Sequence, residues 1–215
     1  HELIDGSKRA AEDPDTRVVI VTGMGKAFCV GGDLNSPMYH IKDPGELEKV
    51  VQTFGQVAIN LRNMPKPVIA MINGAAAGGG FGLALAADIL IASEKAKLGH
   101  VYLNIGVQSD TGAIFFLPRL IGVARAAELV FTGRVIDAFE ARDMGLVNRV
   151  VPPDQLEAET MKLARRLAKG PAFAMGMAKR ALYQCLTMDL ATAIEYEARG
   201  HVMTMLSDDM QEGIA

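Results

Sequence analysis

The spacing of apolar and polar positions changes repeatedly along this chain and predicts alternating strands and helices. Short apolar runs rich in β-branched residues predict buried strands, because they are too short for helices. Such runs occur at residues 18–21, 68–72, 89–92 and 147–151. Between residues 44 and 64 the apolar positions recur at helical spacing instead, and Pro65 and Pro67 end that pattern. This alternation indicates an α/β protein.

The chain beyond residue 151 has a helical pattern only. Helices are expected over residues 155–169, 172–186 and 190–207. Asp154 is a plausible N-cap for the first of them, and Gly170-Pro171 separates it from the second. We therefore divide the chain into a core, residues 1–151, and a C-terminal helical region, residues 152–215.

Two glycine-rich turns each follow a predicted strand. The first is FCVGGDL, residues 28–34, and the second is NGAAAGGG, residues 73–80, which precedes an expected helix over residues 80–87. Glycine adopts backbone angles that other residues avoid and lets a ligand approach the main chain closely. Two such turns could direct two N–H groups at one oxygen, as in an oxyanion hole. Taken singly, each turn is equally typical of a tight strand-to-helix corner.

Composition narrows the range of partners. Half of the 215 residues are hydrophobic and the net charge is −3, which suits one globular domain and argues against a nucleic-acid partner. No apolar run is long enough to cross a membrane. The two cysteines, Cys29 and Cys185, lie far apart without metal-like spacing, which favours free thiols and a cytoplasmic location. No metal or cofactor is expected.

The two turns and their flanks resemble the signature segments of the crotonase (enoyl-CoA hydratase/isomerase) superfamily. The matching segments are GKAFCVGGDL, residues 25–34, and PKPVIAMINGAAAGGGFGLALAADI, residues 65–89, followed by LVFTGR at 129–134 and ARDMGLV at 141–147. The resemblance implies the crotonase fold, an α/β spiral of repeated ββα units with a C-terminal helical trimerisation region. It implies a homotrimer or a dimer of trimers. It also implies an N-terminal strand pair that this chain is expected to lack.

The resemblance further implies an acyl-CoA thioester as the substrate, with coenzyme A as part of that substrate. By the matched motifs, the N–H groups of Gly32 and Gly79 would hold the thioester oxygen. The positions expected to contact the substrate are Lys26, Ala27, Val30, Asp33, Leu34, Ala77, Gly78 and Tyr102.

The chain departs from the hydratases of this family at both of their glutamates. The matched motifs place these at Gly82 and Tyr102, and neither residue can act as a carboxylate. A carboxylate does occur at Asp110, in GVQSDTG, residues 106–112. This segment resembles the stretch of family isomerases in which an aspartate moves a proton between carbons of the acyl chain. Asp110 is also typical of a helix N-cap, because an apolar helical pattern follows it.

These residues favour a shift of a double bond in an enoyl-CoA, with Asp110 as the proton shuttle. An enoyl-CoA hydratase-like lyase, an acyl-CoA hydrolase and an aryl-CoA dehalogenase with a nucleophilic aspartate remain alternatives in the same fold. So does a non-catalytic scaffold that binds acyl-CoA. His40 and His100 are more typical of surface or hydrogen-bonding residues than of acid–base groups. The aromatic residues Tyr39, Tyr102, Phe115 and Phe116 favour a bulky acyl group.

Overall fold

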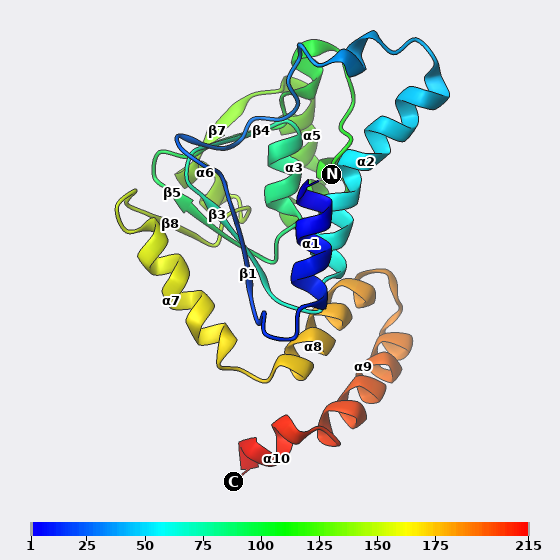
Figure 1. Ribbon diagram of the computed structural model, residues 1–215, viewed down its shortest axis with the longest axis vertical. Helices are drawn as coiled ribbons and strands as arrows, with labels where there is room; N and C mark the ends of the chain where they lie inside the picture. Colours follow the sequence, from blue (N-terminus) through cyan, green and yellow to red (C-terminus); the bar gives the residue numbers. More distant parts are fainter. Residues whose placement is uncertain (1, 215) are drawn as a thin grey trace.

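The computed structural model describes residues 2–214 and contains two sheets that the chain visits in turn (Figure 1). The first sheet has four strands in the order β1 (Val19–Thr22), β3 (Val68–Ile72), β5 (Ile89–Ser93) and β8 (Arg149–Val151). Neighbouring strands in it are parallel. The second sheet has the order β2 (Ala27–Cys29), β4 (Ala75–Ala77), β6 (Lys97–Gly99) and β7 (Val135–Asp137). Only its last pair, β6 with β7, is antiparallel.

Each of the first three strands of the first sheet leads to a strand of the second sheet and then to a helix. The helices that end these units are α2 (Pro44–Asn63), α3 (Gly79–Leu85) and α4 (Ala113–Ile121). Short 3₁₀ turns, η1 (Pro37–His40) and η2 (Val101–Ile105), precede α2 and α4. This repetition confirms the predicted spiral of ββα units.

The first sheet is covered on both faces, and this explains why its inner strands are continuous apolar runs. On β3, Val68, Ala70 and Ile72 pack into the main core that contains α3. Ile69 faces the opposite way and packs with Leu156 of α7 (Leu156–Ala168). Side chains alternate between the two faces of a strand, so a single run supplies both layers. Figure 1 shows α3 and α7 on opposite sides of these strands.

The predicted helices form, with ends that differ by a few residues. α2 begins after Asp43, whose side chain accepts a hydrogen bond from the Glu46 N–H at 2.7 Å. The expected cap at Asp154 is wrong. A turn in which the Gln155 N–H donates to the Pro152 carbonyl at 3.0 Å precedes α7, and Gln155 takes the cap position without a side-chain bond.

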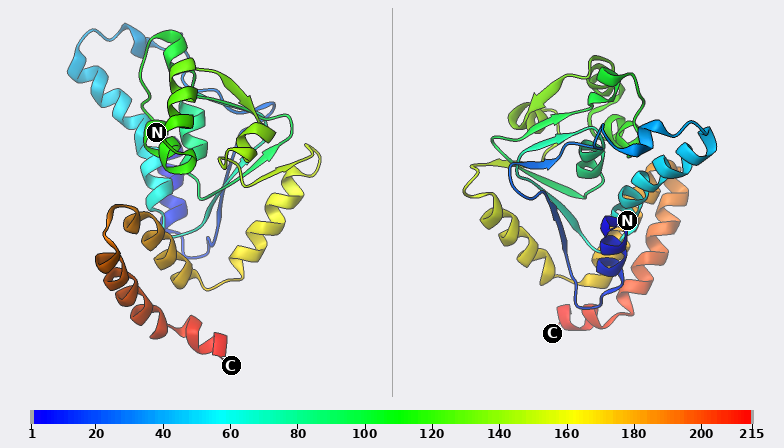
Figure 2. Two further views of the ribbon diagram at one scale, coloured as in Figure 1. Left: turned by 180° about the vertical axis from the view of Figure 1, so that it is seen from behind. Right: turned by 45° about the horizontal axis from the view of Figure 1, so that its top comes forward.

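The C-terminal helices lead away from the sheets, as Figures 1 and 2 show. They are α8 (Ala172–Gln184), the 3₁₀ turn η3 (Cys185–Thr187), α9 (Leu190–Met205) and α10 (Asp208–Ile214). The segment from α9 to α10 carries apolar side chains that are each more than half exposed, namely Leu190, Ile194, Val202, Met203 and Leu206. Patches of this kind usually mark an interaction surface.

Some elements were not anticipated from the sequence. They are α1 (Glu2–Glu12), α5 (Val123–Thr132) and α6 (Ala138–Asp143), together with the short strands of the second sheet. α1 lies along α2 (Figure 1), where Asn60 donates a hydrogen bond to the Ser7 hydroxyl at 2.9 Å. β8 ends at Val151, yet α7 beyond it packs on the first sheet, so the division at residue 151 stays a prediction. In the described part of the chain no helix is long and apolar enough to cross a membrane.

The contact between α8 and the core depends on Gly176. A Cβ atom at Gly176 would lie 2.7 Å from the Pro65 carbonyl oxygen, so α8 would have to move away. We expect Gly176→Ala to lower the free energy of unfolding by about 1–3 kcal/mol through overpacking. Gly200 in α9 is the matched control, because a Cβ there meets only the end of Met177 at 3.5 Å. Gly200→Ala should leave stability unchanged or raise it by up to about 1 kcal/mol. Denaturant titration measures both, and equal effects would contradict the packing argument.

Candidate active site

The two glycine-rich turns lie side by side because β2 and β4 pair in parallel. The pairs Ala27 with Ala75 and Cys29 with Ala76 bring the residues that follow both strands together. Gly31 has a φ angle of +94° and Gly78 one of +54°, conformations that favour glycine. A Cβ atom on Gly31 would lie 3.4 Å from the amide nitrogen of Gly79. The absence of side chains thus permits the close approach of the two main chains.

The two N–H groups predicted to hold the substrate lie at these turns. Gly79 is the first residue of α3, and the N–H groups of a first helical turn have no partner within the helix. The neighbouring Gly78 N–H donates to the Gly99 carbonyl at 3.1 Å. By contrast, the N–H groups of Gly32 and Gly79 donate to no main-chain acceptor within residues 2–214. Both therefore have a free donor.

Asp110, Tyr102 and Thr111 form a hydrogen-bonded cluster against the second turn. The Tyr102 hydroxyl donates to Asp110 Oδ1 at 2.6 Å and lies 3.0 Å from Thr111 Oγ1. A Cβ atom on Gly79 would be 3.6 Å from the same hydroxyl, which places the cluster beside the turn. Burial, reinforced by the bond to Asp110, raises the pKa of Tyr102 above its usual value. Tyr102 is therefore a neutral donor to the carboxylate.

Asp110 is not the N-cap of α4. The structural role that the sequence also suggested for this residue is therefore not the one it has. Gly112 occupies the cap position with a φ angle of +82°, and no side chain caps the helix there. The Asp110 carboxylate bonds to Tyr102 instead. The carboxylate is thus held by η2, the element before its own loop, and remains available for chemistry.

Packing restricts the two positions that were matched to the glutamates of the hydratases. A Cβ atom at Gly82 would collide with the side chain and the carbonyl of Thr111. No longer side chain can therefore be placed there without moving the Asp110–Thr111 segment. The second glutamate position is filled by the phenol of Tyr102, which is buried.

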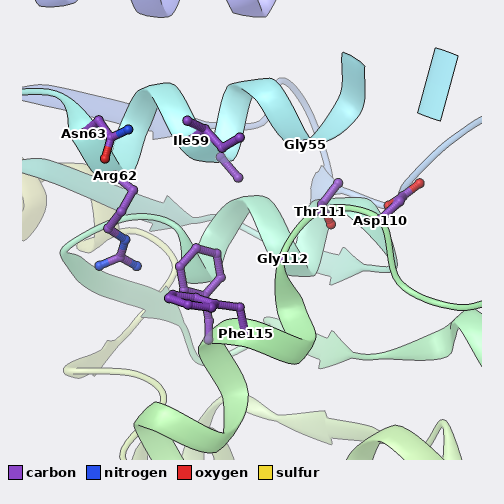
Figure 3. A pocket seen from close by; sticks show the side chains of 10 residues that line it. Gly55, Ile59, Arg62, Asn63, Asp110, Thr111, Gly112 and Phe115 are labelled. Carbon is purple, nitrogen blue, oxygen red and sulfur yellow. The ribbon is translucent and has the colours of Figure 1, made fainter. Parts of the chain in front are cut away.

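A cavity of about 370 Å³ lies between α2 and the segment that leads into α4 (Figure 3). It is lined by Gly55, Ala58, Ile59, Arg62, Asn63, Asp110, Thr111, Gly112, Phe115 and Phe116. Figure 3 shows Asp110 and Thr111 at one end and Arg62 and Asn63 at the other. A Cβ atom on Gly55 would lie 3.1 Å from the Asp110 carbonyl, so α2 touches the carboxylate-bearing loop there. A long, mostly apolar chamber with a carboxylate at one end suits an acyl chain.

The other predicted contact residues follow the first turn or line its partner strand. Lys26, Asp33 and Gly32 are exposed, as are Val30 (62%) and Leu34 (58%). Ala27 lies in β2 and Ala77 in β4, next to Gly78. Asp33 shapes the turn itself, because its carboxylate accepts the Asn35 N–H at 2.9 Å. None of these residues lines the cavity.

The two histidines considered as acid–base groups, His40 and His100, differ in environment. His40 is exposed at the end of η1, as expected for a surface residue. His100 is 1% exposed, and neither of its ring nitrogens has a hydrogen-bond partner among the described residues. Burial lowers its pKa, which keeps it neutral behind the Tyr102 ring at 5.1 Å between centroids. The expectation of a surface or hydrogen-bonding residue is therefore wrong for His100.

Sequence reasoning missed the contribution of α2 to the cavity. Gly55, Ile59 and Arg62 recur at spacings of four and three, so they share one face of the helix. An arginine on the same face as apolar residues was the available signal. Cys29 and Cys185 are free, as predicted. Within residues 2–214 no group of His, Cys, Asp or Glu side chains is arranged to hold a metal ion.

Comparison with known proteins decides which family has this arrangement. The family model described as "Enoyl-CoA hydratase/isomerase" matches residues 1–215. The chain belongs to the enoyl-CoA hydratase/isomerase family. The crotonase fold follows as well, because the crystal structure of an enoyl-CoA hydratase from Bacillus anthracis matches with a TM-score of 0.94 at 38% identity, over 99% of this chain and 82% of that one.

Two curated relatives illustrate the range within the family. The protein YngF of Bacillus subtilis is 40% identical over 92% of this chain and 76% of its own length. The 1,2-epoxyphenylacetyl-CoA isomerase of Escherichia coli is 34% identical over 100% of this chain and 82% of its own length. The first carries the name "Putative enoyl-CoA hydratase/isomerase YngF" and the second is named as an isomerase. These names do not decide the reaction of this chain, which must be argued from its site residues.

The Tyr102 hydroxyl can be tested as the group that fixes the cluster. Tyr102→Phe leaves Asp110 and Thr111 without their shared partner, which should lower the free energy of unfolding by about 1–3 kcal/mol. Tyr196→Phe on α9, away from the site, is the matched control and should change stability by less than about 0.5 kcal/mol. Denaturant titration with circular dichroism measures both. A Tyr102→Phe protein as stable as its control would show that the bond to Asp110 contributes nothing.

Proposed function

We propose that this protein is an enoyl-CoA isomerase that shifts a double bond along an acyl-CoA thioester. One observation carries the proposal: the cavity has a carboxylate at Asp110, and the position matched to a hydratase glutamate has no room for a side chain. Asp110 lies in the wall of the apolar cavity, whereas Thr111 leaves no room for a side chain at Gly82. Water addition in this family uses two glutamates, and this site offers one carboxylate at a different position.

The reaction follows from the groups that are present. The Asp110 carboxylate takes a proton from the carbon next to the thioester carbonyl of a 3-enoyl-CoA. The electron pair moves into a conjugated enolate. The enolate oxygen accepts hydrogen bonds from the N–H groups of Gly32 and Gly79. Asp110 then returns the proton to C4, so that the double bond lies between C2 and C3. One carboxylate serves as base and then as acid, and no water enters the product.

Tyr102 contributes by holding the carboxylate. Its hydroxyl donates a hydrogen bond to Asp110 Oδ1, and this leaves Oδ2 to accept the substrate proton. As a neutral phenol with a raised pKa it donates to the carboxylate and does not compete for the proton. Fixing the carboxylate in this way avoids reorganisation during the transfer.

The cavity supports an acyl group of some bulk. Phe115 and Phe116 form a T-shaped pair with 5.3 Å between ring centroids, and both line the cavity. Tyr102 donates a hydrogen bond to Asp110 at one end of the cavity, whereas Tyr39 does not line the cavity. The E. coli relative is named for isomerisation of a ring-containing acyl-CoA. Lyase, hydrolase and dehalogenase chemistry and a non-catalytic scaffold remain rival proposals that product analysis separates.

Replacing the proposed proton shuttle tests the function. Asp110→Asn keeps the size of the side chain but removes its basicity, so turnover of a 3-enoyl-CoA should fall by at least about a hundredfold. Binding of a saturated acyl-CoA should stay within about threefold. Asp143→Asn is the control, because that exposed carboxylate pairs only with Arg142 at 2.8 Å.

The assay follows the absorbance of the conjugated product, with crotonyl-CoA and an aryl-CoA as parallel substrates. Unchanged turnover in Asp110→Asn excludes the proton shuttle. Binding without turnover of any ester by the unaltered protein favours the scaffold instead.

The assembly is a second part of the proposal. We infer a homotrimer or a dimer of trimers, which would bury the apolar side chains of α9. Light scattering coupled to size exclusion should give three or six times the 23.0 kDa of one chain. Leu190→Asp and Ile194→Asp together should reduce the assembled mass, and a monomeric parent protein would exclude the trimer. The cytoplasmic location, the lack of a cofactor and the lack of a nucleic-acid partner stay predictions.

A further inference from the structure

The far end of the acyl cavity carries a positive charge that the proposed isomerisation does not use. Arg62 lines this end, opposite Asp110 (Figure 3). Gly55, which adjoins Asp110, precedes Arg62 by two helical turns of α2, so the two ends are about 10 Å apart along the helix. An acyl chain attached near Asp110 would therefore point its distal end toward a guanidinium.

The Arg62 guanidinium is fixed by two aromatic rings and one carbonyl. Its central carbon lies 4.6 Å from the centroid of Phe116 and 4.0 Å from that of Tyr183. Its Nη2 donates to the Leu85 carbonyl at 2.7 Å. Its Nε is buried and has no hydrogen-bond partner within the described residues. A buried donor of this kind costs free energy, and it leaves the charge of the guanidinium only partly compensated.

The charges around Arg62 do not balance within the described part of the chain. Asp88 is the nearby carboxylate, and Lys179 binds it at 2.7 Å while the Tyr183 hydroxyl donates to its other oxygen at 2.7 Å. The Val68 N–H also donates to Asp88 at 2.8 Å. Two cations, Arg62 and Lys179, thus share one carboxylate whose acceptor sites are largely occupied. The proximity of Arg62 also contributes to the lowered pKa of Lys179, after the larger effect of burial.

A second cavity continues the basic character of this end. It has a volume of about 290 Å³ and shares Arg62 and Asn63 with the acyl cavity. Lys179 and Arg180 of α8 line it as well. The surroundings of Arg62 are therefore short of negative charge on both sides. A carboxylate is the ligand that matches a guanidinium without a counter-ion, because hydrogen bonds between two charged groups are the strong ones.

We propose that Arg62 binds a carboxylate at the distal end of the acyl group, so that the preferred substrates are mono-CoA thioesters of dicarboxylic acids. This inference specifies the substrate class of the proposed isomerase and rests on the same cavity. An uncharged chain end would leave the Arg62 guanidinium at the end of the cavity without a counter-charge, whereas a carboxylate would neutralise the excess cation.

Binding of unreactive esters tests the proposal separately from catalysis. Saturated mono-CoA thioesters of six-, eight- and ten-carbon dicarboxylic acids are compared by calorimetry with monocarboxylic thioesters of equal length. The unaltered protein should bind at least one dicarboxylic member about tenfold or more tightly than its partner, as expected for a charge-assisted pair. Arg62→Met should reduce that ratio to about one. Because no turnover is needed, a failed isomerase assay leaves this result unaffected.

Arg119→Met is the matched control. Arg119 also lies over an aromatic ring, 3.7 Å from the centroid of Phe115, and donates to a carbonyl, but it is exposed and outside the cavity. Its removal should leave the binding ratio unchanged. Arg62→Lys keeps the positive charge and replaces Arg62→Met in the test if Arg62→Met does not fold. It should retain part of the preference for dicarboxylic thioesters. Equal affinities for both ester classes in the unaltered protein, or a preference that survives in Arg62→Met, would overturn the proposal.

Discussion

The parallel pairing of β2 with β4 is the interaction on which the site depends. It is short, and the residues that it pairs are small, yet it brings the turns at Gly31 and Gly78 into contact. Those turns come from segments almost fifty residues apart in the sequence, and each directly follows a strand of the second sheet. Backbone N–H groups that must meet at one oxygen need such rigid supports, because small displacements weaken their effect.

The same close packing is the basis of the chemistry that we propose. Thr111 fills the space beside Gly82, and Tyr102 fills the space of the second glutamate while binding Asp110. A change from glycine to glutamate at position 82 alone would therefore displace the very loop that carries Asp110. In this chain the type of site thus depends on a packed cluster and not on a single residue. Relatives with different activities at similar identity are the expected consequence.

Electrostatics divides the cavity into two ends. The carboxylate of Asp110 and the guanidinium of Arg62 lie at opposite ends of a chamber whose middle is apolar. Charges separated in this way bind a ligand in one orientation, because each end accepts only one kind of group. The arginine is held by aromatic rings and a carbonyl, so its position is fixed before any ligand arrives.

The sequence alone determined the strands of the first sheet, the main helices, the glycine turns and Asp110 as a carboxylate at an unusual position. The strands and helices depend on local pattern, which short-range sterics and burial impose directly. Asp110 was found through the resemblance of its segment to family isomerases. The second sheet escaped notice because its three-residue strands are too short for a pattern to show. Only the tertiary structure decided that Asp110 binds Tyr102 and does not cap α4, that Gly82 has no space, and that Arg62 closes the cavity. Each of these depends on which distant segments touch, and contacts of that kind leave no periodic trace in a single chain.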